Sequence, residues 1–200
     1  MNVIATDLVS SGGPIRSPVV AVSGPVVLSD GTRLALRALR PDDRERYVRA
    51  LRGLSAETLF RRFGGPKHRL SDSEVDRFLD VGHEGREAVV ATDSPGHEII
   101  AVARVAPWPN EEGTGDVGIV VADAWQRRGL GTILMASLLI AAAQHGYVRL
   151  RATSLVENRP AASLLRRHGF RCLSTSYGVS EWLVDLSGLL VVIEHTSPSP

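Results

Sequence analysis

The chain has 200 residues, 44% of them hydrophobic and 22% charged, a composition typical of one soluble globular domain. Its formal net charge is +1 and its arginines are scattered along the sequence, so the composition gives no support for a nucleic-acid-binding surface. No apolar run is long enough to span a bilayer, and residues 1–24 lack the apolar centre of a signal peptide, so we expect a cytoplasmic protein that does not enter a membrane.

The first half of the sequence predicts a flexible arm, a hairpin and three short helices. Residues 1–24 mix Ser, Gly, Pro and Val without periodicity, which is typical of a loose arm. Two apolar runs within residues 26–37 flank an Asp30-Gly31 turn and predict a β-hairpin. Three helix start signals follow: Arg40-Pro41-Asp42, Ser55, and a capping box formed by Ser71 and Glu74.

The second half of the sequence predicts strands and two further helices. Strands are expected at residues 88–91, 99–102, 117–121, 148–152, 170–174 and 181–186. One helix is expected between Gly129 and Gly146 and another between Asn158 and Gly169, each closed by a glycine.

The order of these elements predicts an α+β (mixed α/β) domain over residues 25–187, in which one sheet is covered by helices on both faces. Residues 188–200 end in Ser-Pro-Ser-Pro, which is typical of a flexible tail. The single cysteine, Cys172, excludes an internal disulfide bond and falls in a predicted strand, where we expect a buried thiol.

A glycine-rich segment connects the strand at 117–121 to the long helix. Residues 126–131 read Gln-Arg-Arg-Gly-Leu-Gly, which contains neither the Gly-Lys-Ser/Thr triplet of a P-loop nor the third glycine of a G-x-G-x-x-G fingerprint. Glycine at 129 and 131 allows positive φ angles and a close approach of a ligand to the backbone. Free N–H groups at a helix N-terminus bind anions, so the segment predicts a pyrophosphate site beside Arg127 and Arg128.

This segment resembles the acyl-CoA pyrophosphate loop of the GNAT superfamily of N-acyltransferases, whose pattern is Q/R-x-x-G-x-G/A. The resemblance continues to Asn158 at the start of the last helix and to Gly169-Phe170 at its end, and it covers residues 25–187. It implies the GNAT fold, one central and mostly antiparallel twisted sheet that is splayed at its centre with helices on both faces. It also implies acetyl-CoA as the acyl donor, without a metal.

A narrower resemblance is to the bacterial protein-lysine acetyltransferases of the Pat type. Four segments carry it: Ser29-Asp30-Gly31-Thr32, Arg40-Pro41-Asp42-Asp43, residues 54–63 with Arg61-Arg62-Phe63 at their end, and Asp123-Ala124-Trp125-Gln126. In that group the catalytic domain is usually fused to a nucleotide-sensing or acyl-CoA-synthetase-like domain, so we expect this chain to be a stand-alone catalytic domain. An acyl-CoA synthetase is the usual protein target of the group.

The resemblance also implies a set of cofactor-binding residues. Backbone groups of the central strand hold the pantetheine arm and polarise the thioester carbonyl, and the glycine loop holds the pyrophosphate. Asn158 either contacts the pantetheine arm and nearby water or only caps its helix. The expected cofactor-binding residues are Ile119, Val120, Val121, Gln126, Arg127, Arg128, Gly129, Leu130, Gly131, Thr132 and Asn158.

Acyl transfer to an amine needs a base, and the Pat-type proteins carry a glutamate on the central strand before the glycine loop. The matching residue is Asp116, which is one methylene shorter, and Glu111 and Glu112 on the preceding loop are the alternatives. Many relatives use a tyrosine on the last helix as general acid, and Leu165 occupies that position. The six histidines do not cluster, so no metal site is expected.

Three functions are compatible with these residues. The first is transfer of acetyl to a protein lysine, the second is transfer to a small amine, and the third is acyl-CoA binding by a catalytically silent sensor module. The partners expected are therefore a protein such as an acyl-CoA synthetase, or a small amine, with no nucleic acid and no membrane. The sequence does not fix the oligomeric state, the acyl chain or the acceptor.

Overall fold

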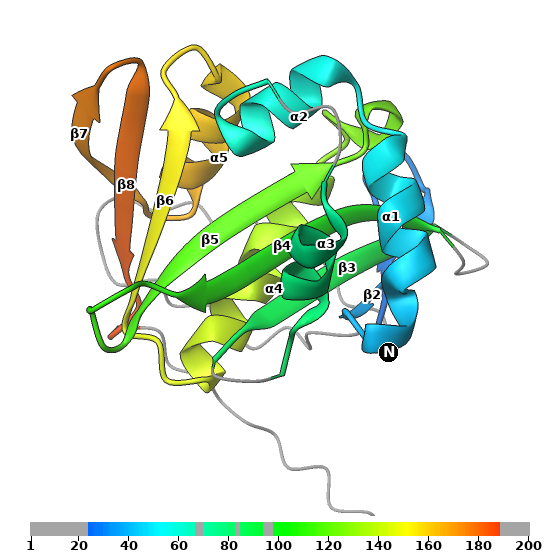
Figure 1. Ribbon diagram of the computed structural model, residues 1–200, viewed down its shortest axis with the longest axis horizontal. Helices are drawn as coiled ribbons and strands as arrows, with labels where there is room; N and C mark the ends of the chain where they lie inside the picture. Colours follow the sequence, from blue (N-terminus) through cyan, green and yellow to red (C-terminus); the bar gives the residue numbers. More distant parts are fainter. Residues whose placement is uncertain (1–23, 67–69, 83–84, 94–97, 189–200) are drawn as a thin grey trace, which may run out of the picture.

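The computed structural model describes residues 24–66, 70–82, 85–93 and 98–188. Apart from their residues nearest the domain, the arm expected at 1–24 and the tail expected at 188–200 lie outside these ranges. The described elements, shown in Figure 1, are the strands β1 Gly24–Val27, β2 Arg33–Ala38, β3 Glu87–Asp93, β4 Ile99–Pro107, β5 Thr114–Val121, β6 Arg149–Leu155, β7 Arg171–Ser176 and β8 Val179–Asp185, the helices α1 Arg44–Arg52, α2 Ala56–Phe63, α3 Asp72–Leu79, α4 Leu130–Gln144 and α5 Arg159–Arg167, and the short 3₁₀ turns Pro41–Asp43 and Asp123–Trp125.

The strands form one eight-stranded sheet in the order β1-β2-β3-β4-β5-β6-β8-β7. Every neighbouring pair is antiparallel except β5 and β6, which are parallel. Helices α1 and α3 pack on one face of the sheet, and α4 and α5 pack on the other. The mixed α/β fold class with a mostly antiparallel sheet is therefore confirmed.

The two faces of the sheet bury separate cores, as strand alternation requires. Helix α4 is apolar on nearly all sides and supplies the centre of the larger core with fully buried Leu134 and Leu138. The smaller core joins Tyr47 of α1 and Val75 of α3 to the opposite face of β3 and β4. The central strands are thus covered on both sides, which agrees with their unbroken β-branched runs.

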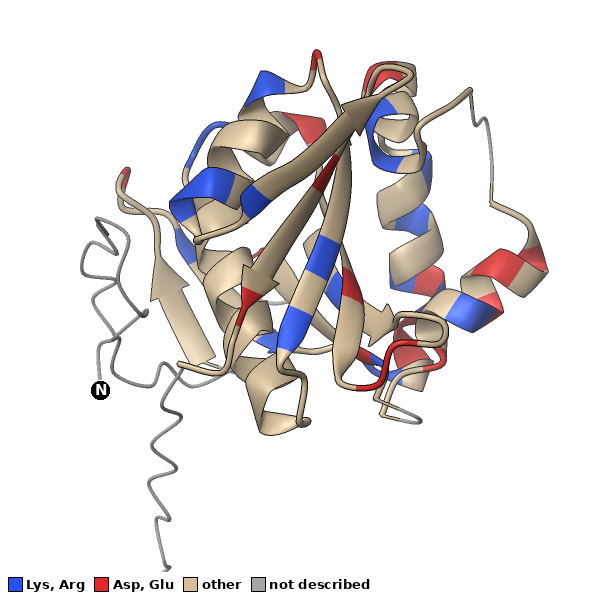
Figure 2. Cartoon of the chain, turned by 90° about the vertical axis from the view of Figure 1, so that its left-hand side faces the viewer, with Lys and Arg blue, Asp and Glu red and all other residues tan. Residues whose placement is uncertain are grey.

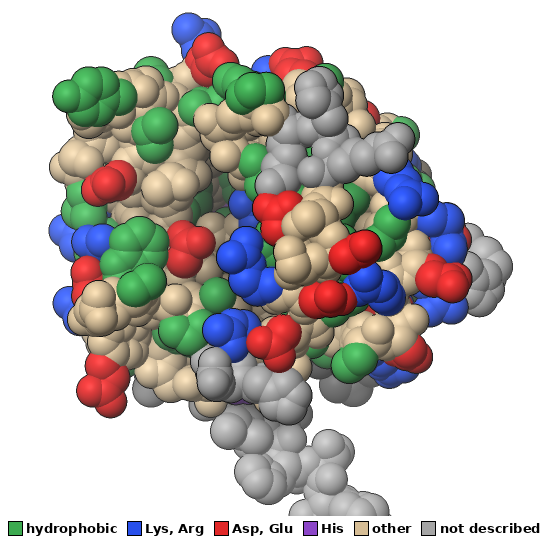
Figure 3. Space-filling model, viewed as in Figure 1, with side chains coloured by type: hydrophobic (Ala, Val, Ile, Leu, Met, Phe, Trp, Pro, Cys, Tyr) green, Lys and Arg blue, Asp and Glu red, His purple; other side chains and the backbone are tan. Residues whose placement is uncertain are grey.

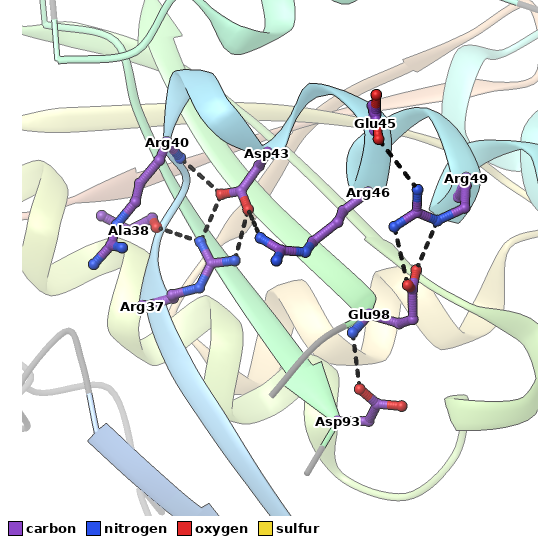
Figure 4. A network of polar contacts seen from close by, with 9 residues as sticks. All are labelled: Arg37, Ala38, Arg40, Asp43, Glu45, Arg46, Arg49, Asp93 and Glu98. Carbon is purple, nitrogen blue, oxygen red and sulfur yellow. Dashed lines mark hydrogen bonds and ion pairs between the residues drawn. The ribbon is translucent and has the colours of Figure 1, made fainter. Parts of the chain in front are cut away.

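The turn before α1 is fixed by a buried carboxylate. Asp43 is completely buried, and its two oxygens accept hydrogen bonds from Arg37 at 2.6 and 2.7 Å (Figure 4). The backbone N–H of Arg40 donates to the same carboxylate at 3.0 Å, and Arg46 lies 3.3 Å from it. Burial by itself raises the pKa of Asp43, but these hydrogen bonds and the charge of Arg37 outweigh it and lower that pKa. The Arg-Pro-Asp-Asp motif therefore fixes α1 against β2.

The last strand of the sheet corrects one expectation. Cys172 lies in β7, and all six residues of this edge strand are exposed, so the thiol is exposed rather than buried. Among the described strands β7 pairs with β8 alone, and Leu173 beside the cysteine is half exposed. The strand pattern was identified, but its place at the edge was not, because pairing order is a long-range property.

Charged residues of both signs are interspersed over the strands and helices in Figure 2, which agrees with the net charge of +1. Within the ranges that the structure describes, no helix has the length and hydropathy that a membrane span requires.

Candidate active site

Strands β5 and β6 are paired at one end and separate at the other. Their register joins only Thr114 to Arg149, Gly115 to Leu150 and Asp116 to Arg151. Beyond Asp116, β5 remains paired with β4 as far as Val121, while β6 remains paired with β8 as far as Leu155. The sheet is therefore splayed between β5 and β6 (Figure 1).

The hydrogen bonds at the two ends of β5 show which backbone groups face this gap. The N–H of Ala122 donates to the carbonyl of Ile100 in β4 at 2.8 Å. The carbonyl of Gly113 faces the opposite way and accepts from the N–H of Arg149 at 3.1 Å. Backbone groups alternate in direction along a strand, so odd-numbered residues of β5 face the gap and even-numbered residues face β4.

Because of this alternation, the three β5 residues expected to contact the cofactor differ in the direction of their backbone groups. Ile119 directs its N–H and carbonyl into the gap, where they could hold a pantetheine arm. The carbonyl of Val121 also faces that way but accepts a hydrogen bond from Gln126 Nε2 at 3.0 Å. The backbone groups of Val120 are paired towards β4, so the groups that face the gap are the N–H and carbonyl of Ile119 and the N–H of Val121.

The N-terminus of α4 presents unpaired backbone donors. Gly129 caps the helix with a φ of 85°, and Arg127 also has a positive φ of 65°. The N–H of Thr132 donates to the carbonyl of Gly129 at 3.0 Å, so it is already in use. Among the described residues, no partner is found for the N–H groups of Arg127, Arg128, Gly129, Leu130 and Gly131. Such donors at the positive end of a helix fit a pyrophosphate group.

The two arginines of the loop differ in their surroundings. Arg128 donates through Nε and Nη2 to Asp30 Oδ2 at 2.9 and 2.6 Å, and its guanidinium group lies 4.6 Å above the ring of Trp125. Hydrogen bonds from Thr32 and Arg128 lower the pKa of Asp30 to about 2, so the carboxylate stays ionised. Arg128 is therefore neutralised by the first hairpin, whereas Arg127 is exposed and has no ion pair with any residue that the structure describes.

The expected role of Gln126 also changes, because its side chain is used within the protein. Gln126 Nε2 donates to Thr58 Oγ1 at 3.0 Å as well as to the Val121 carbonyl. Asp123 in turn accepts from the N–H and the hydroxyl of Ser55 at 2.9 and 2.7 Å, and from Thr58 Oγ1 at 2.7 Å. The start of α2 is thereby attached to the turn before the glycine loop, and Gln126 positions that loop.

The two ends of α5 make different polar contacts. Asn158 Oδ1 accepts from the N–H of Ala161 at 3.2 Å, so the residue is the helix N-cap, while its role at the cofactor stays a prediction. At the other end His168 is buried, with Nδ1 2.9 Å from the Leu164 carbonyl and Nε2 3.1 Å from the Thr132 carbonyl. His168 therefore connects the end of α5 to the first turn of α4.

Asp116 lies on β5 at the point where the strands separate, and it faces the side of the sheet that carries α1 to α3. Its carboxyl group keeps solvent contact, yet partial burial raises its pKa, while the charges of Arg62 and Arg104 act in the opposite direction. A base needs an ionised carboxylate with some affinity for a proton, and a raised pKa supplies it. Position and chemistry therefore both suit Asp116 as the base.

The two alternative bases lie on the loop between β4 and β5. Glu111 Oε1 is 3.6 Å from Arg151 Nη1, and the guanidinium group of Arg151 lies 4.9 Å above the ring of Trp108. Glu112 is exposed. Glu111 thus faces a cation, and neither glutamate lies on β5, where the strands separate.

Two arginines at this site were not identified as site residues from the sequence. Arg62 of α2 lies against the backbone of Gly118, where an added Cβ would overlap the guanidinium group. Arg104 of β4 is the register partner of Gly118 and lies 4.5 Å above the ring of Phe78. The signals were a glycine inside a strand, which indicates close packing, and an arginine within the apolar run of β4.

The position of the usual general acid is apolar. Leu165 is buried in the larger core, so no phenol is available there to protonate a leaving thiolate. Tyr147 donates its hydroxyl to the Gly85 carbonyl at 2.7 Å. Tyr177 is fully exposed at the β7–β8 turn. Within the described part of the chain, no group of histidine, cysteine, aspartate and glutamate side chains is arranged to hold a metal ion.

Comparisons with known proteins agree with the fold. The sequence pattern of the acetyltransferase (GNAT) family matches residues 48–170, more than half of the chain. The chain is also 30% identical over 145 residues to an acetyltransferase of Pseudomonas aeruginosa, a match that covers 72% of this chain and 77% of the relative. The chain therefore belongs to the GNAT family of acetyltransferases.

The narrower resemblance is confirmed as well. The acetyltransferase Pat of Mycolicibacterium smegmatis is 28% identical over 162 residues, which cover 81% of this chain but 48% of that protein, so the chain spans about half the length of this relative. The solved GNAT domain of S. lividans PAT superposes with a TM-score of 0.76 at 28% identity and covers 85% of this chain and all of that one. The chain is thus an N-acetyltransferase that uses acetyl-CoA as its acyl donor and is similar to the Pat-type enzymes.

Proposed function

We propose that the chain transfers acetyl from acetyl-CoA to the ε-amine of a lysine on a protein partner. The observation that supports this acceptor is the joining of two Pat-like segments beside the site. Asp123 and Gln126 hold Ser55 and Thr58, so residues 54–63 are attached to the turn that leads into the glycine loop. Pat-type relatives modify proteins, and an acyl-CoA synthetase is the target class that the resemblance suggests.

The proposed mechanism is direct attack of the amine on the thioester. Asp116 accepts a proton from the attacking nitrogen as the N–C bond forms. A backbone N–H of β5 that faces the gap, that of Ile119, donates to the carbonyl oxygen as it becomes anionic. The C–S bond then breaks and the sulfur leaves as thiolate, because Leu165 supplies no proton. The N–H groups at the start of α4 hold the pyrophosphate and fix the donor in position.

A panel of purified acyl-CoA synthetases and lysate proteins, incubated with labelled acetyl-CoA beside free amines and aminoglycosides, tests the proposed acceptor. We expect protein lysines to be labelled, at a rate that rises with pH because lysine has a reference pKa of about 10.4. Turnover of a small amine without protein labelling would replace the protein acceptor by a small one. Binding of acetyl-CoA without any transfer would instead identify a silent sensor.

A further inference from the structure

Three arginines lie near Asp116 on the same side of the sheet. Register places Arg104 of β4 beside Gly118, and Asp116 is its diagonal neighbour on the same face. Arg62 crosses Gly118 from α2, and Arg151 of β6 is the register partner of Asp116. Figure 3 shows this face hollowed between the β6–β8 side and α3, with basic side chains at the border of the hollow.

Arg62 and Arg104 form no direct ion pair in the part of the chain that the structure describes, although the charge of Asp116 acts on both. Their cationic groups contact the faces of Phe63 and Phe78 at 5.3 and 4.5 Å, and Arg104 Nη1 is buried without a hydrogen-bond acceptor. Burial lowers the pKa of both guanidinium groups, and the charge of Arg62 adds to the effect on Arg104. Asp116 is thus one carboxylate facing two partly desolvated cations, and a buried charge without a direct partner is costly, so this pair is suited to a second anionic group from outside.

The charge balance of the reaction indicates what that group is. An amine that approaches Asp116 arrives mostly as an ammonium ion and meets two guanidinium groups that share this single carboxylate. A carboxylate on the same acceptor would offset this repulsion and would form charge-assisted hydrogen bonds with the arginines. We propose that Arg62 and Arg104 bind a carboxylate carried by the acyl acceptor, close to the amine that Asp116 deprotonates. This inference rests on the proposed transfer to an amine, but it does not require a protein acceptor.

Two pairs of acceptors distinguish the two sources of such a carboxylate. The first pair is a set of peptides with one lysine and a glutamate within two residues of it, and the same set with glutamine. The second pair is free lysine and lysinamide. We expect the ratio of kcat/KM between the charged and neutral members of one pair to be about tenfold or more, the usual effect of hydrogen bonds to a charged group. Preference in the first pair identifies a protein segment, and preference in the second identifies a free amino acid.

Variants connect that preference to the arginines. Arg62→Met and Arg104→Met should each reduce the charged-to-neutral ratio about tenfold, and Arg62→Lys should restore part of it. Arg61→Ala is the matched control, because Arg61 is next to Arg62 on α2 but pairs with Glu57 at 2.5 Å, and its ratio should not change. Equal rates with both members of both pairs in the wild-type protein would overturn the proposal, and this result needs no variant to fold.

A binding measurement separates this inference from the proposed function. Calorimetry with norleucine in place of lysine uses peptides that cannot accept acetyl, flanked by glutamate or glutamine. Tighter binding of the glutamate peptide that is lost in Arg62→Met supports the carboxylate site even if transfer to proteins fails. Equal binding of both peptides, together with equal rates, contradicts the site even if protein lysines are acetylated.

Discussion

The guanidinium group of Arg62 lies directly on the backbone of Gly118, in the space that any larger residue would need. We predict that Gly118→Ala displaces the guanidinium group and lowers the free energy of unfolding by about 1 kcal/mol, the low end of the cost of overpacking, because the end of an arginine side chain can shift. Chemical denaturation measures this change. In an Arg62→Ala background the same substitution should cost less than about 0.5 kcal/mol, because the overlapping group is gone. Equal costs in the two backgrounds would assign the packing at Gly118 to another contact.

The glycine loop gives a second prediction. A Cβ atom at Gly131 would lie 3.6 Å from Leu164 Cδ2, an ordinary contact, so Gly131→Ala should fold and retain acetyl-CoA affinity within a few fold. Gly131→Asp adds a negative charge among the donors expected to hold the pyrophosphate, and it should abolish binding. Calorimetry with acetyl-CoA measures both variants. Unchanged affinity in a folded Gly131→Asp protein would remove the loop from the cofactor site.

The buried carboxylate of Asp43 predicts a stability effect away from the site. Asp43→Asn keeps the size of the side chain but removes the anionic partner of Arg37, whose side chain is only 20% exposed (Figure 4). Loss of one member of a buried ion pair costs roughly 3 kcal/mol or more. Urea denaturation at neutral pH measures the loss. Asp42→Asn on the adjacent exposed residue is the matched control and should change stability by less than about 0.5 kcal/mol.

His168 predicts a pH dependence of stability. Burial lowers its pKa in the folded state, although the Leu164 and Thr132 carbonyls act in the opposite direction. The unfolded chain therefore binds the proton more readily than the folded protein. Neutral His168 leaves the free energy of unfolding at its full value above a pH of about 6.5, and this free energy decreases as the pH falls through the lowered pKa. We expect His168→Gln to remove up to one proton from the uptake on unfolding in this window. Denaturation at several pH values measures it, and identical pH slopes for the two proteins would refute it.

The sequence was sufficient for much of the fold because its signals are local. The Asp30-Gly31 turn, the Ser71 capping box and the glycines that close the helices each act within a few residues. The glycine loop could be recognised for the same reason. The splay between β5 and β6 entered only through the family resemblance, since pairing that stops after Asp116 leaves no local pattern.

The contacts that complete the site were not predictable because they join distant segments. Arg128 reads as a loop cation, yet its partner Asp30 is 98 positions away in the sequence. Arg62 reads as an exposed residue of a short helix, yet it reaches across β5 to Gly118. Which face of a helix meets the sheet depends on packing among all elements, and the sequence pattern alone does not encode it locally.

The most direct test of the account is the kinetics of Asp116→Asn, compared with Glu112→Gln. If Asp116 accepts the proton of the amine, its loss should reduce kcat by roughly 10²–10⁴-fold, the usual contribution of a positioned base, with acetyl-CoA affinity nearly unchanged. Because its pKa is raised above the usual value, wild-type activity should also fall as the pH drops through that raised pKa and the carboxylate is protonated. Full activity of Asp116→Asn together with an inactive Glu112→Gln would contradict the account and place the base on the loop.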